Sequence, residues 1–454
     1  MSFSLEQFAR RLTDAAEAVA DAETVKKVRG RVSELLGDLP DTAVQGINRV
    51  MRTARDGVSS LQGIFTETNQ SETSVINASG ILQQDQLRGA MVDDAAIVAA
   101  ANGMRLQQYC PDVVHRGDRR GMESAFGLSV DYQVLIFHSV TLAMAALHSR
   151  GMIHQVAGMG KGIAVPRSAA VPVGEGRLLP DALGALMPQG PTGIVEIGSV
   201  GQVSDGDWPA QHAACMVSDH RGGLGDVQAP GAPVPLILYA PQVVLHRHSF
   251  ADEIVLATLD ELLAGHQVNE SGERKETGFG APAAVVFPGD GLLGGPCCGV
   301  LVIRRALAGQ LFDSTTQSLF AASEPIQQAV QISATRVRQG GLEDPTPVMA
   351  GLQTHIDNLR HRAERLATRL SALSGVESVG VTDQPARIVA FGEGCLPSRQ
   401  VVVQGRDAKP WHDQLLRTSP GVFTSLSENG LVIDLRFVDA AQDRQLGDLL
   451  CADA

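Results

Sequence analysis

Residues Gly289–Gly299 read GDGLLGGPCCG, a glycine-rich stretch that closely follows an apolar run. That run, Ala283–Phe287, is short and continuously apolar, which is typical of a strand buried on both faces of a sheet. Gly294, Gly295 and Gly299, together with Pro296, could form a cradle for an anion.

A similar pattern extends over residues 75–335, where short apolar runs alternate with turns and helical stretches. It predicts a large α/β domain with a mostly parallel sheet and helices on both faces. We expect the polar segment His266–Gly280 to be an exposed loop insertion. The predicted strands are Val134–Phe137, Gly162–Val165, Gly193–Ile197, Val234–Leu238 and Ala283–Phe287.

Residues 336–454 predict a linking helix and a small α+β domain. Leucines and other apolar residues from Leu352 to Leu373 recur at steps of four and three, which predicts one helix over 345–374 that Gly375 ends. Strand-like runs follow it. On pattern alone, this order is analogous to that of fold-type-I pyridoxal-phosphate (PLP) enzymes. The runs are Val376–Val381, Arg387–Phe391, Gln400–Val403 and Leu431–Val438.

Residues 1–67 predict a helical N-terminal segment, followed by a polar linker at Thr66–Ser74. The formal net charge of −13 argues against a large basic nucleic-acid surface, so we expect no DNA partner and doubt tRNA binding. No apolar stretch of membrane-spanning length and no signal peptide occurs. The cysteines form no CxxC pair, so a cytoplasmic protein with reduced thiols is expected.

The stretch GDGLLGGPCCG resembles the signature of bacterial selenocysteine synthase, the L-seryl-tRNA(Sec) selenium transferase family. Other pieces fall in the same order at compatible spacing, so the resemblance covers roughly residues 75–454. It implies the fold-type-I, aspartate-aminotransferase-like architecture, and it favours a tight turn against the sheet over an anion cradle for the glycines and Pro296 of GDGLLGGPCCG. The pieces are Val75–Gly80 (VINASG), His115–Glu123 (HRGDRRGME), Val165–Asp181 (VPRSAAVPVGEGRLLPD), Ile194–Gly198 (IVEIG) and Leu431–Val438 (LVIDLRFV).

The family's chemistry, as the resemblance implies it, uses PLP held by a lysine, with an aspartate on the ring nitrogen. This sequence departs from that pattern. Gly291 stands at the lysine position, and Pro288 stands three residues earlier, where the family has a serine. Ile237 matches the aspartate. Loss of all three groups implies a chain without PLP, unless the cofactor binds non-covalently or through an unrecognised lysine.

Remnants of the cofactor cleft are implied at His138 and Ser139, which match the family's phosphate loop, and at Arg167 and Asp290. Arg167 belongs to a group of arginines, with Arg116, Arg119 and Arg120, that could form an anion-binding surface or pair with neighbouring carboxylates. Arginine cannot replace the lysine, because its guanidinium stays protonated. The chain has five lysines, at positions 26, 27, 161, 275 and 409.

Other polar pairs carry weaker signals. His246 and His248 share a face of an extended segment, but no third ligand has metal spacing, so we expect no metal. Asp219–Arg221 predicts a turn with exposed polar residues, with a ligand contact as the alternative. We expect Cys297 and Cys298 to be small packing residues rather than a vicinal disulfide.

Three functions remain open from the sequence. The first is a degenerate, PLP-free pseudoenzyme that acts as a binding, scaffold or regulatory homologue, with an active paralogue as one partner. The second is a PLP-dependent transferase that acts on seryl-tRNA(Sec) or a small amino acid. The third is a new activity in the vacated cleft that uses Asp290, His138 or the Cys297–Cys298 pair. The resemblance also implies a homo-oligomer, at least a dimer.

Overall fold

The computed structural model describes residues 74–452 apart from gaps, of which the longest are 106–119, 150–161, 186–192, 248–254 and 313–320. The predicted N-terminal helical segment and most of the predicted linker lie outside the described residues. Residues Val75–Ala454 form one compact unit.

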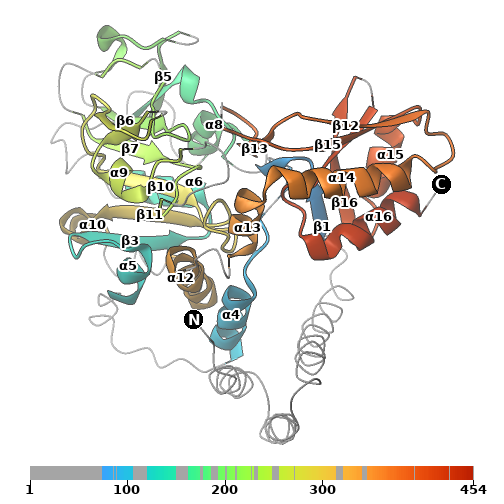
Figure 1. Ribbon diagram of the computed structural model, residues 1–454. Coiled ribbons are helices and arrows are strands. Elements are labelled where there is room, and N and C mark those ends of the chain that lie inside the picture. Colours follow the sequence, from blue (N-terminus) through green and yellow to red (C-terminus); the bar gives the residue numbers. More distant parts are fainter. Residues whose placement is uncertain are drawn as a thin grey trace, which may run out of the picture. The chain divides into compact units, whose positions relative to one another are not determined.

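A seven-stranded sheet forms the centre of the large domain (Figure 1). All of its strands run parallel except β11, which is antiparallel to both of its neighbours, β10 and β3. The predicted mostly parallel α/β sheet is therefore confirmed. The order is β3 (Tyr132–Phe137), β11 (Gly299–Arg304), β10 (Ala284–Pro288), β7 (Leu236–Tyr239), β6 (His212–Val217), β4 (Gly162–Pro166) and β5 (Ile194–Ile197).

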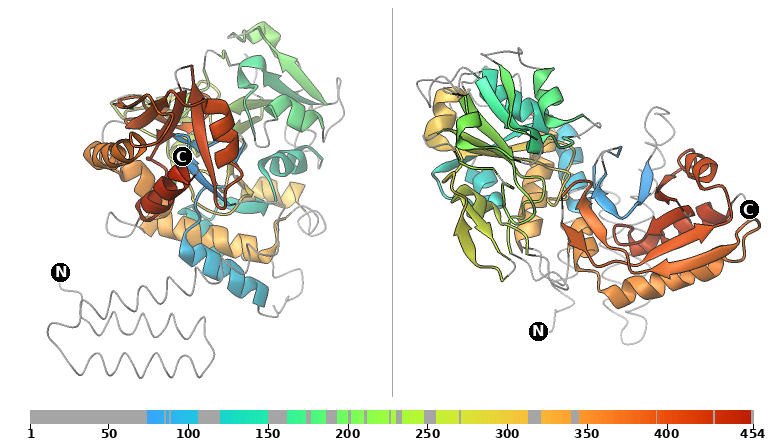
Figure 2. Two further views of the ribbon diagram at one scale, coloured as in Figure 1. Left: turned by 90° about the vertical axis from the view of Figure 1, so that its right-hand side faces the viewer. Right: turned by 90° about the horizontal axis from the view of Figure 1, so that it is seen from above.

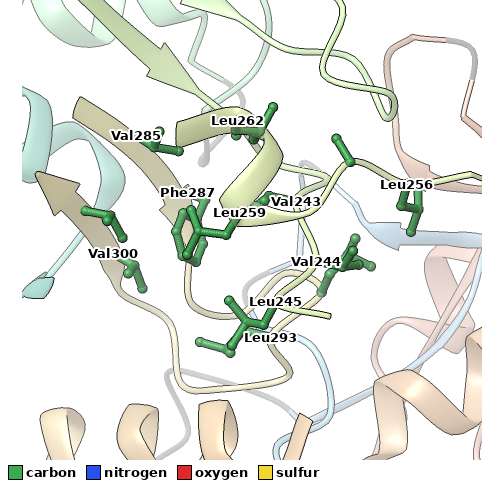
Figure 3. Packing of buried hydrophobic residues seen from close by; sticks show 14 of the residues in the cluster. Val243, Val244, Leu245, Leu256, Leu259, Leu262, Val285, Phe287, Leu293 and Val300 are labelled. Carbon is green, nitrogen blue, oxygen red and sulfur yellow. The ribbon is translucent and has the colours of Figure 1, made fainter. Parts of the chain in front are cut away.

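Helices cover both faces of this sheet because alternate strand residues point to opposite sides. Helices α5 (Arg120–Phe126), α9 (Leu259–Leu263) and α12 (Glu324–Gln339) bury one set of side chains, part of which is drawn in Figure 3. The other set packs against α6 (Val140–Ser149), α8 (Leu179–Gly184) and α10 (Arg305–Leu311). Burial on both faces explains why these strands read as continuous apolar runs.

The C-terminal part contains two further sheets. In the five-stranded sheet, β1 (Val75–Ala78) pairs in parallel with β16 (Gly421–Ser427). Figure 2 shows the blue β1 beside the red C-terminal strands. The sequence had placed this segment in the large domain, so the strand pairing corrects that placement. The remaining strands of the sheet are β17 (Gly430–Asp434), β15 (Gln400–Gln404) and β12 (Ser378–Thr382).

The smaller sheet joins distant parts of the chain in the same way. Its strand β2 (Ile81–Gln83) pairs in parallel with β13 (Ala386–Val389), which pairs with β14 (Cys395–Leu396). The helices α14 (Ile356–Leu370), α15 (Ala408–Leu415) and α16 (Asp443–Cys451) pack on the five-stranded sheet.

The long helix predicted over 345–374 is two helices, α13 (Pro347–Gln353) and α14. Thr354 and His355 adopt extended backbone angles between them, and the His355 side chain caps α14 by accepting the amide of Asp357. Leu352 packs in the core of the large domain, whereas Leu359 packs in the C-terminal core. The apolar steps of four and three therefore continue across a break, because both helices bury leucines.

The segment His266–Gly280 is also more ordered than predicted. It forms a hairpin of β8 (His266–Val268) and β9 (Arg274–Glu276) around a polar turn in which Asn269 accepts the amide of Glu273. The polar turn residues misled the prediction, because they occupy only the tip of the hairpin.

Candidate functional site

A cavity of about 370 Å³ opens at the carboxyl ends of β3, β7 and β10. Ligands of open α/β folds bind at this edge, where the loops after the strands meet. The cavity is not filled by the large apolar side chains around it. Its polar lining residues are Gln83, Gln84, His138, Ser139, Thr141, Arg177, Tyr239, Asp290, Cys297 and Cys298.

The loop Gly289–Gly299 forms one wall of this cavity. It joins the antiparallel strands β10 and β11, and it closes on itself because Gly295 donates its amide to the Gly289 carbonyl at 2.9 Å. A Cβ at Gly289 would meet the Cys298 sulfur, and one at Gly294 would lie 3.2 Å from Val348 of α13. The predicted tight turn against the sheet is therefore confirmed.

Gly291, which the sequence resemblance matches to the family's lysine, faces a glutamine. A Cβ built at Gly291 would lie 2.8 Å from Nε2 of Gln83 and 3.1 Å from Cγ of Pro288. The Gln83 side chain is held there because its Nε2 donates to the Pro241 carbonyl at 2.8 Å. The space into which a lysine would extend is thus occupied by a fixed amide.

The position matched to the family's aspartate is apolar and closed. Ile237 is 1% exposed, packs in the core of the α6–α8–α10 face, and does not line the cavity. Tyr239, two residues later and on the same face of β7, lines it instead. The ring nitrogen of PLP would need a carboxylate on β7. This strand presents only the hydrocarbon side chain of Ile237 and the phenol of Tyr239 there.

A second wall of the cavity, at the amino end of α6, can hold an anion. Ser139 caps α6, because its Oγ accepts the Leu142 amide at 3.1 Å, and this helix end carries a partial positive charge. Exposed Arg177 precedes α8 and adds a cation to the lining, and exposed His138 lies beside Ser139. The sequence had indicated His138 and Ser139 but not Arg177, which had no distinguishing neighbour.

Asp290 and the two cysteines meet at the loop wall. The Cys297 thiol forms a hydrogen bond with the Asp290 carboxylate, and Gly89 donates its amide to Oδ2 of Asp290 at 3.0 Å. Burial raises the pKa of Asp290 above its ordinary value, against these hydrogen bonds, which lower it. Cys298 is buried, as predicted for a packing residue, but Cys297 is exposed and lines the cavity.

Arg167 does not belong to this cavity. It lies half-exposed beyond β4, donates to the Gly198 carbonyl and lies 4.0 Å from the Glu196 carboxylate. Arg116 and Arg119 and the side chain of Arg120 lie outside the described residues. The predicted arginine surface therefore contributes no described residue to the cleft.

The other polar residues that the sequence singled out do not line the cavity either. Asp219 accepts the amides of Arg221 and Gly223 at 2.7 Å, so this segment is the predicted polar turn. His246 is exposed, and His248 lies outside the described residues. Among the residues that the structure describes, no group of three or more histidines, cysteines or carboxylates could hold a metal ion.

The described residues do not fit PLP as a covalently held cofactor. Lys275 lies on the exposed β9 and Lys409 pairs with Asp413 in α15 at 2.6 Å, and neither lines the cavity. The other three lysines, at positions 26, 27 and 161, fall outside the described ranges. Among the residues that the structure describes, no lysine therefore lies near Gly291 to bind PLP, and no carboxylate stands at Ile237 to pair with its ring nitrogen.

The chain is similar to two curated proteins of the same name. The chain is similar to the L-seryl-tRNA(Sec) selenium transferase of Haemophilus ducreyi, with 23% identity over 411 residues, covering 83% of this chain and 82% of the relative. The enzyme of the same name from Rhizobium meliloti is 24% identical over 394 residues, covering 80% and 78%. No protein-family model matches the chain.

Among solved structures, D-glucosaminate-6-phosphate ammonia-lyase matches with a TM-score of 0.52 and 15% identity, covering 84% of this chain and 95% of that one. The fold is that of fold-type-I PLP enzymes. Within the described part of the chain, no helix is both long and apolar enough to cross a membrane.

Proposed function

We propose that the cavity at the carboxyl ends of β3, β7 and β10 binds a small anionic molecule non-covalently, in a selenocysteine-synthase-like protein similar to the two L-seryl-tRNA(Sec) selenium transferases above. In this proposal the protein is a pseudoenzyme that acts as a binding, scaffold or regulatory homologue. One observation carries it: the Gln83 amide occupies the space beside Gly291, while the cavity stays open toward Ser139 and Arg177.

The anionic class of ligand follows from the charges around the cavity. The amino end of α6 and Arg177 lie on one side, and both favour a negative group. The single carboxylate of the described lining, Asp290, lies on the loop wall and is hydrogen-bonded within that wall by Gly89 and Cys297. A phosphate or carboxylate group would therefore bind at the α6 side.

The alternative of an active PLP transferase has less support. It needs a lysine from outside the described residues to reach the cleft, and a replacement for the carboxylate absent at Ile237. The acidic balance of the chain also counts against seryl-tRNA(Sec) as a substrate. Assembly into a homo-oligomer, at least a dimer, and association with an active paralogue remain proposals that accompany the first function.

Isothermal titration of the purified chain with inorganic phosphate and with PLP tests the proposal. We expect both to bind one site and to compete, and we expect borohydride treatment to leave the chain mass unchanged. A borohydride-stable, one-to-one adduct on one lysine would overturn the proposal in favour of the PLP enzyme. Absence of phosphate and PLP binding would overturn the anionic ligand.

A further inference from the structure

The cavity contains one negative charge that no described side chain neutralises. Asp290 is the single carboxylate of the described lining, and its side chain is half-buried. Burial raises the pKa of this carboxyl, against three uncharged donors that lower it: its own amide, the Cys297 thiol and the Gly89 amide. No lysine, arginine or histidine of the described ranges forms an ion pair with it. A carboxylate taken partly out of water without a countercharge is costly, so a cation that enters the cavity is stabilised beside it.

The Asp290 carboxylate also keeps capacity for a further donor. An ionised carboxylate has about four acceptor positions, and the three donors leave one of them available, with the Gly89 amide at 3.0 Å from Oδ2. An ammonium group matches this position, because it carries donors, a positive charge and no acceptor. A phosphate or carboxylate group would be repelled there.

The carboxylate and the anion-binding wall belong to one small cavity. A Cβ at Gly299 would overlap the Ser139 carbonyl, so the end of the loop lies directly against the amino end of α6. Cys298, the residue before Gly299, packs its sulfur against Gly289, the residue before Asp290. Ser139 and Asp290 both line the same cavity of about 370 Å³. One small molecule can therefore contact both the carboxylate and the helix end.

We propose that the ligand of this cavity is a small phosphorylated amine, whose ammonium group binds Asp290 and whose phosphate lies at the amino end of α6 and Arg177. The inference rests on the proposed anion site and deepens it, because it adds the opposite charge and so names the class of ligand.

The remaining surroundings suit such a molecule. The amides at the start of α6 and the guanidinium of Arg177 offer donors from two elements, which suits a phosphate with several oxygens. Much of the other lining is apolar, so a short hydrocarbon chain suits the part of the ligand that joins its two charges. The apolar lining includes Leu82, Leu87, Leu142, Val173, Val389 and Phe391.

The test compares amines with matched alkyl phosphates by titration calorimetry of the full chain at neutral pH. The probes are 2-aminoethyl and 3-aminopropyl phosphate, each paired with ethyl or propyl phosphate, which has the same chain length but no ammonium group. The proteins are the wild type, Asp290→Asn and Asp413→Asn, and circular dichroism verifies that each is folded. Asp413→Asn is the matched control, because it removes a carboxylate of α15 that does not line the cavity.

In the wild type, we expect at least one amine to bind about tenfold more tightly than its alkyl partner. Asp290→Asn removes this preference without weakening the binding of the alkyl phosphates, because it deletes the carboxylate and leaves the α6 wall intact. Asp413→Asn keeps the preference. Since both variants lower the net charge of −13 equally, the difference between them isolates a contact in the cavity from general attraction of amines to an acidic chain.

Two results would overturn the inference alone. One is equal affinity of each amine and its alkyl partner in the wild type, a comparison that needs no variant to fold. The other is a preference for amines that persists in folded Asp290→Asn protein. In both cases the alkyl phosphates still bind, so the anion site of the proposed function stands. If neither amines nor alkyl phosphates bind, the inference and the anion site are both overturned.

Discussion

The two walls of the cavity, the loop Gly289–Gly299 and the amino end of α6, differ in which functional groups they present. The loop wall resembles the family's glycine-rich motif in sequence, yet it carries Gly291 at the position matched to the family's lysine and faces the fixed amide of Gln83. The α6 wall still presents a capped helix end and a nearby arginine, Arg177. In the proposed function, the wall that binds an anion is therefore separate from the positions at which the family's lysine and aspartate would act.

The largest expected effect comes from breaking the contact between the walls. Gly299 begins β11, and a Cβ there would overlap the carbonyl of Ser139, which precedes α6. Because backbone meets backbone, neither side can move cheaply, and Gly299→Ala is expected to lower the free energy of unfolding by about 3 kcal/mol. Urea denaturation followed by circular dichroism measures it.

Gly309 in α10 provides the matched control, because a Cβ there would meet nothing within 4 Å. Gly309→Ala is expected to raise the free energy of unfolding by about 0.5–1 kcal/mol through helix propensity. Equal free energies of unfolding for the Gly299→Ala protein and the wild type would show that the two walls are not in close contact at this position.

The next effect concerns the α6 wall alone. Arg177→Gln removes its cation and is expected to weaken phosphate binding about tenfold, or about 1.4 kcal/mol, measured by titration calorimetry. Arg167→Gln is the control, because Arg167 does not line the cavity, and phosphate affinity should stay unchanged. Equal losses in the two variants would contradict an anion site at this wall.

A smaller effect is expected at Gln83. Gln83→Leu removes the hydrogen bond to the Pro241 carbonyl while keeping most of the side-chain volume. The expected loss is about 1 kcal/mol in the free energy of unfolding, with phosphate affinity unchanged because the Gln83 side chain contacts Gly291 and Pro241 rather than Ser139 or Arg177. Weaker phosphate binding with no loss of stability would instead place Gln83 at the anion site.

The smallest effect concerns Asp290 and pH. Burial raises the folded-state pKa of this carboxyl, so the folded protein holds the proton to a higher pH than the unfolded chain. Stability contributed in this way falls as pH rises above the ordinary value of 3.8. Asp290→Asn should therefore lose less stability between about pH 4 and pH 7 than the wild type does. A steeper decline in the variant would reverse the assigned sign.

The central sheet could be predicted from the sequence because its strands are apolar on both faces and leave a continuous signal. The pairing of β1 with β16 could not, since the two strands are more than 300 positions apart and no local pattern joins them. The break at Thr354 was hidden for another reason. Leu352 and Ile356 keep helical spacing across it, although Leu352 packs in one core and Ile356 against another.

Site residues that belong to a recognisable sequence motif could be predicted. Residues that reach the site only through the three-dimensional fold could not. Ser139 and Asp290, both indicated by the sequence, line the cavity, whereas Gly291 does not line it and faces Gln83, which does. Arg167 was expected in the cleft as part of a remnant anion-binding group of arginines, but its side chain contacts Glu196 and Gly198. Gln83 had no signal at all, because its role depends on the empty space that a glycine leaves 208 positions later in the chain.

The separation of the two walls is tested most directly by borohydride trapping with PLP in the wild type and in the Gly291→Lys/Gln83→Leu double variant. This variant supplies the amine and removes the amide that occupies its space. After reduction and peptide mapping, the account predicts no adduct in wild type and one pyridoxyl group on residue 291 of the double variant. A stoichiometric adduct on one lysine of the wild type would contradict it.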